Sequence, residues 1–279
     1  MRYFLLMLIF FSGSLFATQD KKVLIAILAR NKAHVLPEYL KCIEDLDYDK
    51  KMITVYINTN DNEDATAEIL EKWTKENKER YSNIELEHYQ IEGNPQARPH
   101  EWTGARFKIL GNIREKSLKK TKEYGCDYYF VVDCDNFITP TTLKELMDKD
   151  KPIIAPLLKA VPEVNDCYSN YFCAIDANGY YANHPDYYPI LQGSMSGTFK
   201  VPVVHCTYLI KAECLDKLGY VDESHDYEFV IFSKKARESN IDQYICNEKK
   251  FGTLLHFHQD ISLQEEKERW SHFKSGQSS

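Results

Sequence analysis

Two continuous apolar runs dominate the chain, and each is followed at once by polar side chains. Residues 23–29 (VLIAILA) and 128–132 (YYFVV) are apolar on both faces of an extended strand, which is typical of buried strands in a parallel sheet. A shorter run at residues 53–57 leads into the polar stretch 58–64, and residues 84–89 predict an edge strand. The pattern therefore predicts a sheet whose buried strands end in polar residues.

Helical periodicity fills the intervals between these runs. Residues 36–46, 66–81 and 106–124 each carry apolar side chains at a spacing that places them on one helix face. A short helix over residues 139–147 and a buried strand over 153–158 continue the alternation. Alternating strands and helices are typical of βαβ units, so the predicted class is α/β, with a Rossmann-like, mostly parallel central sheet and helices on both faces.

The second half of the chain has weaker periodicity. We expect an aromatic segment over residues 168–188 and one late strand over 202–210 to cover the edge of the sheet. Several acidic residues then precede a helix predicted over residues 229–239. Residues 252–258 are strand-like and end in the sequence HFH, whose two histidines are either structural or metal ligands.

Asp133 and Asp135 follow the apolar run at 128–132 and form a DxD motif. Alternate residues of an extended segment point to the same side, so both carboxylates can face one spot. In open α/β sheets, ligands bind beyond the carboxyl ends of the strands. Two converging carboxylates repel each other unless a cation lies between them, and a hard divalent ion could also hold a diphosphate. A solvated turn is the alternative, because DxD triplets are common by chance.

The helix predicted over residues 106–124 is strongly basic. Most of this charge is typical of a solvated helix face. Arg106 and Arg114 lie near the apolar stripe, however, and could instead reach a phosphate beside the DxD motif. No predicted strand is followed by a glycine-rich phosphate loop, so a bound nucleotide would be held by side chains and a carboxylate-bound metal.

The first 17 residues have the composition of a secretory signal. Arg2 precedes an apolar core at residues 3–11, and small residues before position 18 predict cleavage after Ala17. The core is too short for a membrane span, although Leu15 is an imperfect cleavage-site residue and leaves a retained anchor as the alternative. We expect one domain over residues 18–279, located in the endoplasmic reticulum lumen of a eukaryote or in the periplasm or medium of a bacterium.

Composition narrows the range of partners. The net charge is −7 with both signs interspersed, which gives neither the basic footprint of a nucleic-acid-binding protein nor a polybasic membrane patch. No stretch after the first 17 residues is long and apolar enough to span a bilayer. The eight cysteines show no zinc-site spacing, but Cys167 and Cys173 could close a short disulfide loop in a secreted protein. A homodimer is compatible with the sequence.

The ordered set of motifs resembles the N-terminal glycosyltransferase domain of the procollagen galactosyltransferases, including the related cerebral endothelial cell adhesion protein. The matching segments run through nearly the whole chain after residue 18: 23–34 (VLIAILARNKAH), 103–114, 130–136 (FVVDCDN), 154–157 (IAPL), 168–173 (YSNYFC), 179–181 (GYY), 201–210 (VPVVHCTYLI) and 244–247 (YICN). Two features depart from the family. Its members continue into a second glycosyltransferase domain, and Asn60, flanked by Asp61, stands where the family has an aspartate.

The resemblance implies a GT-A fold with a UDP-sugar site. Ala29 and Arg30 would border the base and ribose, and the base would be contacted by one of three residues, namely Asn60, Asp61 or Asp64. Arg106 and Arg114 match basic positions of the family's helix before the DxD motif.

The resemblance also implies a metal site. Asp133 and Asp135 would hold Mn²⁺, or Mg²⁺, bridging the diphosphate of the donor. His258, or alternatively His256, would be the third protein ligand that many GT-A folds supply late in the chain.

The activity implied is transfer of a hexose, galactose or glucose, from a UDP-hexose to a hydroxyl group of a protein or glycan, with hydroxylysine of a collagen-like chain as one acceptor. An inverting transfer needs a carboxylate to deprotonate that hydroxyl, and Glu228 or Asp226 would serve. These acids could instead be the favoured start of a helix. A degenerate domain acting as a binding or adhesion module is the alternative function, which Asn60 leaves open. A pyrophosphorylase would need a glycine-rich first loop, which is absent.

Overall fold

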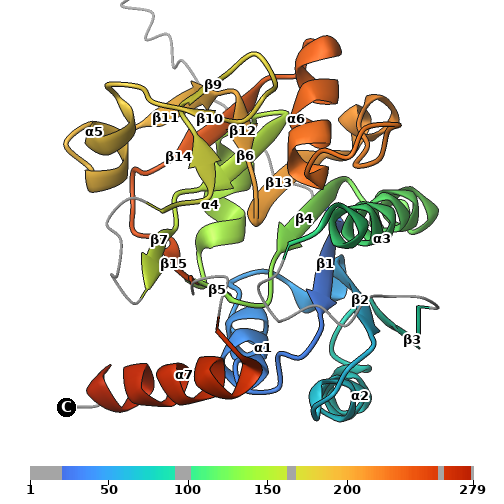
Figure 1. Cartoon of the computed structure of the whole chain (residues 1–279). Helices are drawn as coiled ribbons and strands as arrows, with labels where there is room; N and C mark the ends of the chain where they lie inside the picture. The colour runs from blue at the N-terminus through green and yellow to red at the C-terminus, as the bar shows by residue number, and fades with distance from the viewer. Residues whose placement is uncertain (1–20, 92–101, 162–167, 257–260, 278–279) are drawn as a thin grey trace, which may run out of the picture.

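The fold is described by a computed structural model for residues 21–91, 102–161, 168–256 and 261–277 (Figure 1). The predicted signal sequence, Cys167 and His258 lie outside these residues. The first half contains β1 (Val23–Ala29), α1 (Leu36–Glu44), the short 3-10 helix η1 (Lys50–Met52), β2 (Ile53–Asn60), α2 (Thr66–Asn77), β3 (Asn83–Tyr89), α3 (Gly104–Glu123) and β4 (Tyr128–Val132).

The second half is built from shorter elements. They are β5 (Asn136–Ile138), α4 (Thr142–Asp148), β6 (Ile153–Pro156), β7 (Lys159–Val161), β8 (Tyr171–Phe172), β9 (Ala174–Ile175), β10 (Tyr181–Ala182), α5 (Tyr187–Gln192), β11 (Thr198–Val201), β12 (Val203–Val204), β13 (Thr207–Lys211), η2 (Ala212–Lys217), α6 (Glu228–Glu238), β14 (Gln243–Cys246), β15 (Gly252–Leu255) and α7 (Leu263–Gln277).

An eight-stranded sheet in the order β11-β14-β6-β13-β4-β1-β2-β3 forms the centre of the fold. Strands β4, β1, β2 and β3 are parallel to one another, and so are β6 and β14. Strands β13 and β11 run antiparallel to their neighbours. The predicted α/β class with a mostly parallel sheet is therefore confirmed, and β3 is the edge strand that the sequence predicted.

Helices cover both faces of this sheet, because successive residues of its buried strands point to opposite sides. Val23, Ile25 and Ile27 of β1 pack in one hydrophobic cluster with residues of α1 and α2. Leu24 and Ala26 pack in a second cluster with residues of α3 and α6. Figure 1 shows these two pairs of helices on opposite sides of the sheet. The doubly apolar pattern of β1 and β4 thus reflects burial on both faces, as predicted.

The late strand predicted over residues 202–210 is wrong in both extent and position. It is broken at Cys206, whose positive φ of 64° separates β12 from β13. Strand β13 does not cover the sheet edge but is inserted between β4 and β6 in the sheet. An apolar run reports burial but not strand direction, so the antiparallel insertion could not be predicted. Helix α7 is not among the elements predicted from the sequence.

A second, three-stranded sheet in the order β5-β15-β7 lies beside the DxD turn. Strand β5 begins directly after the motif, and Asn136 pairs with Leu254 of β15. Gly252 makes this approach feasible: its φ is +148°, and an added Cβ would lie only 2.0 Å from the carbonyl oxygen of Phe137. This sheet therefore brings residues 255 and 256 next to a motif that is distant in sequence.

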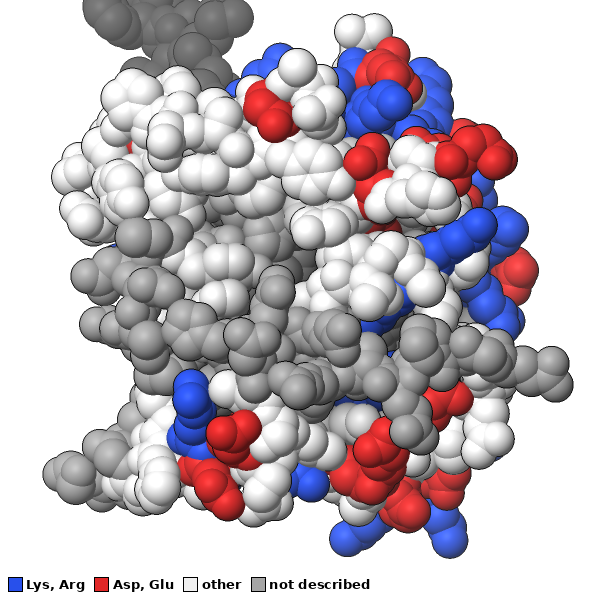
Figure 2. Space-filling model, viewed as in Figure 1, with Lys and Arg blue, Asp and Glu red and all other residues white. Residues whose placement is uncertain are grey.

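Charged side chains of both signs are intermixed on the face shown in Figure 2, among the residues that the structure describes. This distribution agrees with the interspersed charges of the sequence. Within the same residues, no helix is long and apolar enough to cross a membrane.

Candidate functional site

A cavity of about 450 Å³ opens at the carboxyl ends of β1, β2 and β4. In parallel sheets this is the edge where ligands bind, because loops and helix starts surround it. Helix α3 forms one wall, and the start of α6 and the β12–β13 connection form the opposite one. The lining includes Ala29, Arg30, Asn60, Arg106, Arg114, Asp133, Asp135, His205, Glu228 and His256.

The DxD turn is held by backbone and side-chain hydrogen bonds. The Asp133 N–H donates to the carbonyl of Cys206 at 3.0 Å, and the Leu255 N–H donates to the carbonyl of Asp135 at 2.8 Å. The Asn136 amide donates to the hydroxyl of Thr207 at 2.7 Å. The turn is thus fixed by β13 and β15, and both carboxylates line the cavity.

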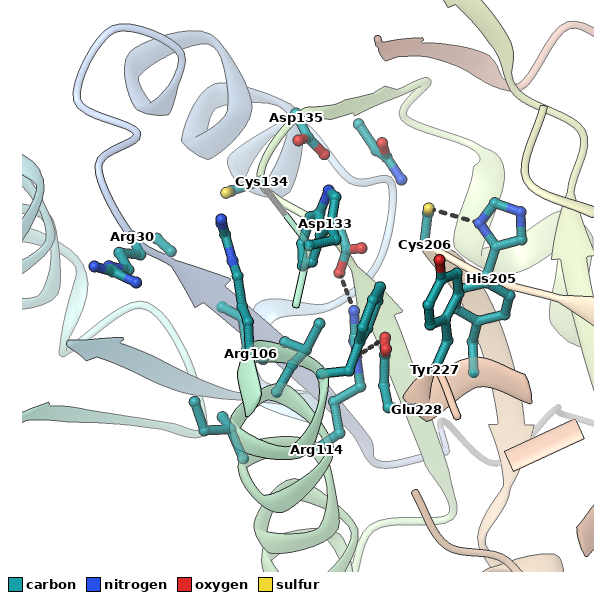
Figure 3. Close-up of a pocket in the computed structure, with 18 of the residues that line it drawn as sticks. Arg30, Arg106, Arg114, Asp133, Cys134, Asp135, His205, Cys206, Tyr227 and Glu228 are labelled. Atoms are coloured by element: carbon teal, nitrogen blue, oxygen red, sulfur yellow. Dashed lines mark hydrogen bonds and ion pairs between the residues drawn. The ribbon is translucent and has the colours of Figure 1, made fainter. Parts of the chain in front are cut away.

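Arg114 lies between two acidic residues that are far apart in sequence (Figure 3). Its Nη2 donates to Oδ1 of Asp133 at 2.7 Å, and its Nε lies 3.5 Å from Oε1 of Glu228. All three line the cavity, and the Arg114 residue is only 3% exposed. Arg114 was expected as a phosphate contact, but the contacts observed here are with carboxylates, which makes it the link between the DxD turn and the start of α6.

Burial dominates the ionisation of this group of residues. It raises the pKa of Asp133 above its ordinary value despite the Arg114 guanidinium, which opposes the shift. Burial likewise raises the pKa of Glu228 to about 7, with Arg114 lowering it and Asp133 adding to the rise. The Oε2 atom of Glu228 is buried without a hydrogen-bond partner. A carboxylate with a pKa near neutrality and a free oxygen can take up a proton from a bound hydroxyl.

Asp226 differs from Glu228 although only one residue separates them. Its carboxylate accepts a hydrogen bond from the hydroxyl of Tyr180 at 2.9 Å, and it is not among the residues that line the cavity. Glu228 is the first residue of α6 and faces the cavity. The structure therefore brings Glu228, but not Asp226, to the DxD motif.

Some of the residues expected to contact the base and ribose of the UDP-sugar line the cavity, and others do not. Ala29, Arg30 and Asn60 line the cavity, whereas Asp61 does not. The Asp61 carboxylate accepts from the Ile91 N–H at 2.9 Å and so holds the end of β3.

Asp64 has a structural position. Its carboxylate accepts from the N–H and hydroxyl of Thr66, at the start of α2, and from the N–H of Ala33. These bonds tie the loop after β1 to α2, so Asp64 shapes the site without lining it.

Arg106 is in the cavity wall near its mouth. The centre of its guanidinium lies 4.2 Å from the centroid of the Trp102 ring. Trp102 stacks on Phe107, which in turn stacks on Tyr227 with 3.9 Å between ring centroids. Aromatic and cationic groups therefore adjoin at the rim, an arrangement suited to bases, sugars and phosphates.

His205 is a cavity residue that the sequence analysis missed. It is 4% exposed, its Nδ1 lies 2.9 Å from Sγ of Cys206, and its Nε2 is buried without a hydrogen-bond partner. Burial, together with the charge of Arg114, lowers its pKa to about 3, so the imidazole is neutral at physiological pH. A single histidine inside an apolar run was the signal available in the sequence.

Lys32 is a second residue that the sequence analysis missed. Its Nζ lies 3.4 Å from Oδ2 of Asp135 and 2.9 Å from Oε1 of Glu266. Each DxD carboxylate thus has a basic partner, Arg114 for Asp133 and Lys32 for Asp135. Glu266 lies in α7, and nothing in its polar sequence neighbourhood distinguished it from a surface acid.

The donor set fits a divalent cation held mainly by carboxylates. Asp133 and Asp135 supply hard oxygen donors at one wall of the cavity, with side-chain exposures of 25% and 28%. His256 lines the same cavity and stacks on Tyr168 with 3.9 Å between ring centroids. Among the described residues, no group of three or more His, Cys, Asp or Glu is already arranged to hold a metal ion. His258, the other candidate ligand, is outside those residues.

Of the two cysteines predicted to close a disulfide loop, only Cys173 lies among the described residues. Cys173 is a free cysteine whose Sγ lies 3.4 Å from Nδ1 of His184, and Cys167 is outside the described residues. Cys246 is fully buried, while Cys42 and Cys206 are partly buried.

The mostly parallel sheet, with acidic residues at the end of β4 beside a cavity, defines a GT-A type fold. Solved structures share it: S. aureus TarS in complex with UDP-GlcNAc superposes with a TM-score of 0.55 at 15% identity, covering 87% of this chain and 60% of that chain. At this identity the likeness concerns the fold alone.

The family follows from the sequence comparison. A family model described as "Glycosyltransferase family 25, N-terminal domain" matches residues 20–274, and the chain belongs to this family. It is 36% identical to procollagen galactosyltransferase 2 of Homo sapiens over 91% of this chain and 42% of that protein. It is 31% identical to inactive glycosyltransferase 25 family member 3 of Homo sapiens, over 83% of this chain and 40% of that protein. The chain thus spans less than half the length of these curated relatives.

Proposed function

We propose that the protein is a metal-dependent glycosyltransferase that moves a hexose, galactose or glucose, from a UDP-sugar to a hydroxyl group of a protein or glycan. The observation that carries the proposal is that the DxD carboxylates and Glu228 open onto one cavity, in which Arg114 contacts both Asp133 and Glu228. Hydroxylysine of a collagen-like chain is one such acceptor, because a relative is a procollagen galactosyltransferase.

The donor would lie across the ends of β1 and β2. Ala29, Arg30 and Asn60 line that part of the cavity and would border the base and ribose. Asn60 offers an amide in place of a carboxylate, and it is better placed for this contact than Asp61, which is absent from the lining. Arg106 would face the phosphates from the first turn of α3.

Asp133 and Asp135 would hold Mn²⁺ or Mg²⁺, with His256 or His258 as a further ligand. The bound ion would supply positive charge that stabilises the diphosphate as it leaves. Arg114 would act as a positioning residue, because its bond to Oδ1 of Asp133 fixes that carboxylate and leaves the other oxygen for a ligand. Its charge also offsets part of the repulsion between the two carboxylates.

Glu228 would be the base of an inverting transfer. The acceptor oxygen forms a bond to the anomeric carbon, the bond from that carbon to the diphosphate oxygen breaks, and the hydroxyl proton passes to Glu228. Burial keeps the pKa of Glu228 at about 7, near the value that suits a base at neutral pH. Asp226 is the weaker candidate because it is bonded to Tyr180 outside the cavity lining.

We further propose that residues 1–17 are a secretory signal and that residues 18–279 form one GT-A domain. The protein would then act in the secretory pathway, in the endoplasmic reticulum lumen of a eukaryote or outside the cytoplasm of a bacterium. An acceptor that is itself exported would meet the enzyme there.

A binding or adhesion module without catalysis is the second candidate. It is favoured by one specific feature of the site, Asn60, and by one feature of the family, an inactive human member at 31% identity. Such a module could still bind a UDP-sugar through the DxD turn.

A screen of UDP-hexoses with Mn²⁺ separates these candidates. The glycosyltransferase should hydrolyse one donor slowly and transfer its sugar to a hydroxyl acceptor faster. Glu228→Gln should bind UDP normally but lose transfer by about 10²–10⁴-fold, since it removes a general base, while Asp226→Asn serves as the matched control and should remain active. UDP binding without hydrolysis or transfer of any UDP-hexose would favour the binding module.

A further inference from the structure

The C-terminal helix places a buried carboxylate behind the DxD turn. Glu266 of α7 is fully buried and accepts from Nζ of Lys32 at 2.9 Å. Nε2 of His34 lies 3.0 Å from the same carboxylate oxygen. Lys32, in turn, lies 3.4 Å from Oδ2 of Asp135. One ammonium group is therefore shared between a helix near the end of the chain and a carboxylate that faces the cavity.

Packing ties the same helix to the turn itself. Trp270 of α7 stacks on Phe137, with 5.1 Å between ring centroids and 7° between ring planes. Phe137 lies in β5, two residues after Asp135. Trp270 also clusters with Val35 and Leu255, which lie in the loop before α1 and in β15. Helix α7 thus contacts, from outside the cavity, the segments that carry Lys32 and the DxD motif, and in Figure 1 it lies alongside α1.

The electrostatic interactions of the Lys32 ammonium group should depend on whether Asp135 holds a cation. Taking an ammonium group out of water is unfavourable, and the carboxylates beside the Lys32 side chain, which is only 14% exposed, offset that cost. A divalent cation bound by Asp135 would repel that ammonium group, which lies within a few ångströms. Glu266 offers the alternative counter-charge, since it is already closer to Nζ than Asp135 is.

We propose that Lys32 and Glu266 form a positioning pair that sets how strongly Asp135 binds a divalent cation, and that cation binding is coupled to the docking of α7. The proposal rests on the proposed function in that it takes Asp135 as part of the cation site. In it, Lys32 competes with the cation for Asp135, and Glu266 draws Lys32 away. Because coupling is reciprocal, the cation should also strengthen the contact of α7 with the rest of the domain.

Substitutions at the two positions should change cation affinity in opposite directions. In Glu266→Gln, Lys32 loses one of its two carboxylate partners and keeps Asp135. The ammonium group then competes more strongly with the cation for Asp135, so Mn²⁺ should bind about five- to tenfold more weakly. In Lys32→Met the competitor is gone, so Mn²⁺ should bind more tightly by a similar factor. A helix that merely supports the fold would weaken binding in both variants.

Mn²⁺ affinity should be measured on the full chain by calorimetry or by the electron paramagnetic resonance of free Mn²⁺, at one fixed concentration of UDP for all variants. Glu268→Gln removes an exposed carboxylate from the same helix and is the matched control, which should bind as the wild type does. If Lys32→Met fails to fold because the buried Glu266 then lacks its ammonium partner, the double variant Lys32→Met/Glu266→Gln removes both charges and should also bind Mn²⁺ more tightly than the wild type. Hydrogen exchange should show slower exchange in α7 when Mn²⁺ is added.

The outcomes separate this inference from the proposed function. If Asp135→Asn leaves Mn²⁺ affinity unchanged, the cation site itself is wrong, and the inference falls with it. If Asp135→Asn weakens binding but Glu266→Gln does not, or if the Lys32 variants fail to bind more tightly, only the positioning pair is overturned. The positioning pair would be supported if Mn²⁺ affinity falls in Glu266→Gln, rises in Lys32→Met and stays the same in Glu268→Gln.

Discussion

At the scale of single residues, the site depends on Arg114. This buried guanidinium contacts the carboxylates of Asp133 and Glu228, which lie on β4's exit turn and on α6. Taking any of these charges out of water is unfavourable, and the attraction between them offsets that cost only while the set is complete. Arg114 is therefore expected to matter for stability as well as for the geometry of the DxD motif.

Replacing Arg114 with Met should destabilise the protein by about 3–5 kcal/mol, because it leaves the buried Glu228 and the partly buried Asp133 without their guanidinium partner. Urea denaturation at pH 7 would measure this change. Lys116→Met in the same helix removes an ion pair with Glu87 whose lysine is 49% exposed, and it should cost less than about 1 kcal/mol. Equal costs for the two variants would contradict the role assigned to Arg114.

The raised pKa of Glu228 should make the stability of the folded protein depend on pH. Burial raises its pKa in the folded protein to about 7, whereas an unfolded glutamate titrates near about 4.3. Between these values the folded state holds a proton that the unfolded state has lost. The contribution of Glu228 to stability is therefore fully present below about pH 4.3 and is lost as the pH rises to about 7.

Glu228→Gln should remove this pH-dependent loss. The free energy of unfolding of the variant, relative to wild type, should rise by up to about 3 kcal/mol between pH 4.5 and pH 7.5, since each pKa unit corresponds to about 1.4 kcal/mol. Urea denaturation of both proteins without added metal, at several pH values, tests this. A difference that stays constant with pH would show that Glu228 ionises normally in the folded state.

At the scale of elements, the close approach of α3 to the segment before α6 brings Arg114 to Glu228. Gly111 lies one turn before Arg114, and a Cβ added there would lie 2.7 Å from the carbonyl oxygen of Tyr220 and 3.4 Å from Cβ of Glu228. The helix can therefore lie this close only with glycine at that position.

Gly111→Ala should destabilise the protein and weaken UDP binding, although alanine favours helix formation by about 1 kcal/mol over glycine. Gly104→Ala in the same helix is the control, because its Cβ would meet nothing closer than 3.9 Å. Thermal unfolding should show a lower midpoint for Gly111→Ala and an equal or higher one for Gly104→Ala. A higher midpoint for both would mean that α3 can move away from Tyr220 without cost.

How well each element could be predicted depended on its periodicity. Strands β1 and β4 were predicted with their observed bounds, because doubly apolar runs require burial on two faces. The insertion of β13 was missed, since its composition suits either direction. Helix α7 was missed because its residues are mostly polar, and its one buried carboxylate, Glu266, looks like its exposed neighbours in the sequence.

The site residues that could be predicted are those that end a buried strand or come directly after one. Asp133, Arg30 and Asn60 leave or end strands at one sheet edge, so the sequence placed them together. Lys32 and His205 owe their positions to a loop and to a broken strand, which periodicity does not report. The separation of Glu228 from Asp226 depends on the way α6 begins, and its start residue could not be fixed from sequence alone.

At the scale of the whole molecule, the export of the chain is a separate prediction. Cleavage after Ala17 should yield a mature protein that begins near Thr18 and is found outside the cytosol. N-terminal sequencing after cell fractionation would measure this. An intact segment 1–17 on a cytosolic product would contradict the signal sequence, and the same segment on a membrane-bound product would indicate a retained anchor.

The central claim for the molecule is that the DxD cavity is a metal-dependent UDP-sugar site. Calorimetric titration of UDP into the full chain, with and without Mn²⁺, tests it most directly, using Asp133→Asn and Asp135→Asn as variants of nearly equal size. We expect UDP to bind the wild type only when Mn²⁺ is present and to bind neither variant measurably, while all three proteins unfold cooperatively. UDP affinity that is the same with and without Mn²⁺, or unchanged in either variant, would contradict the claim.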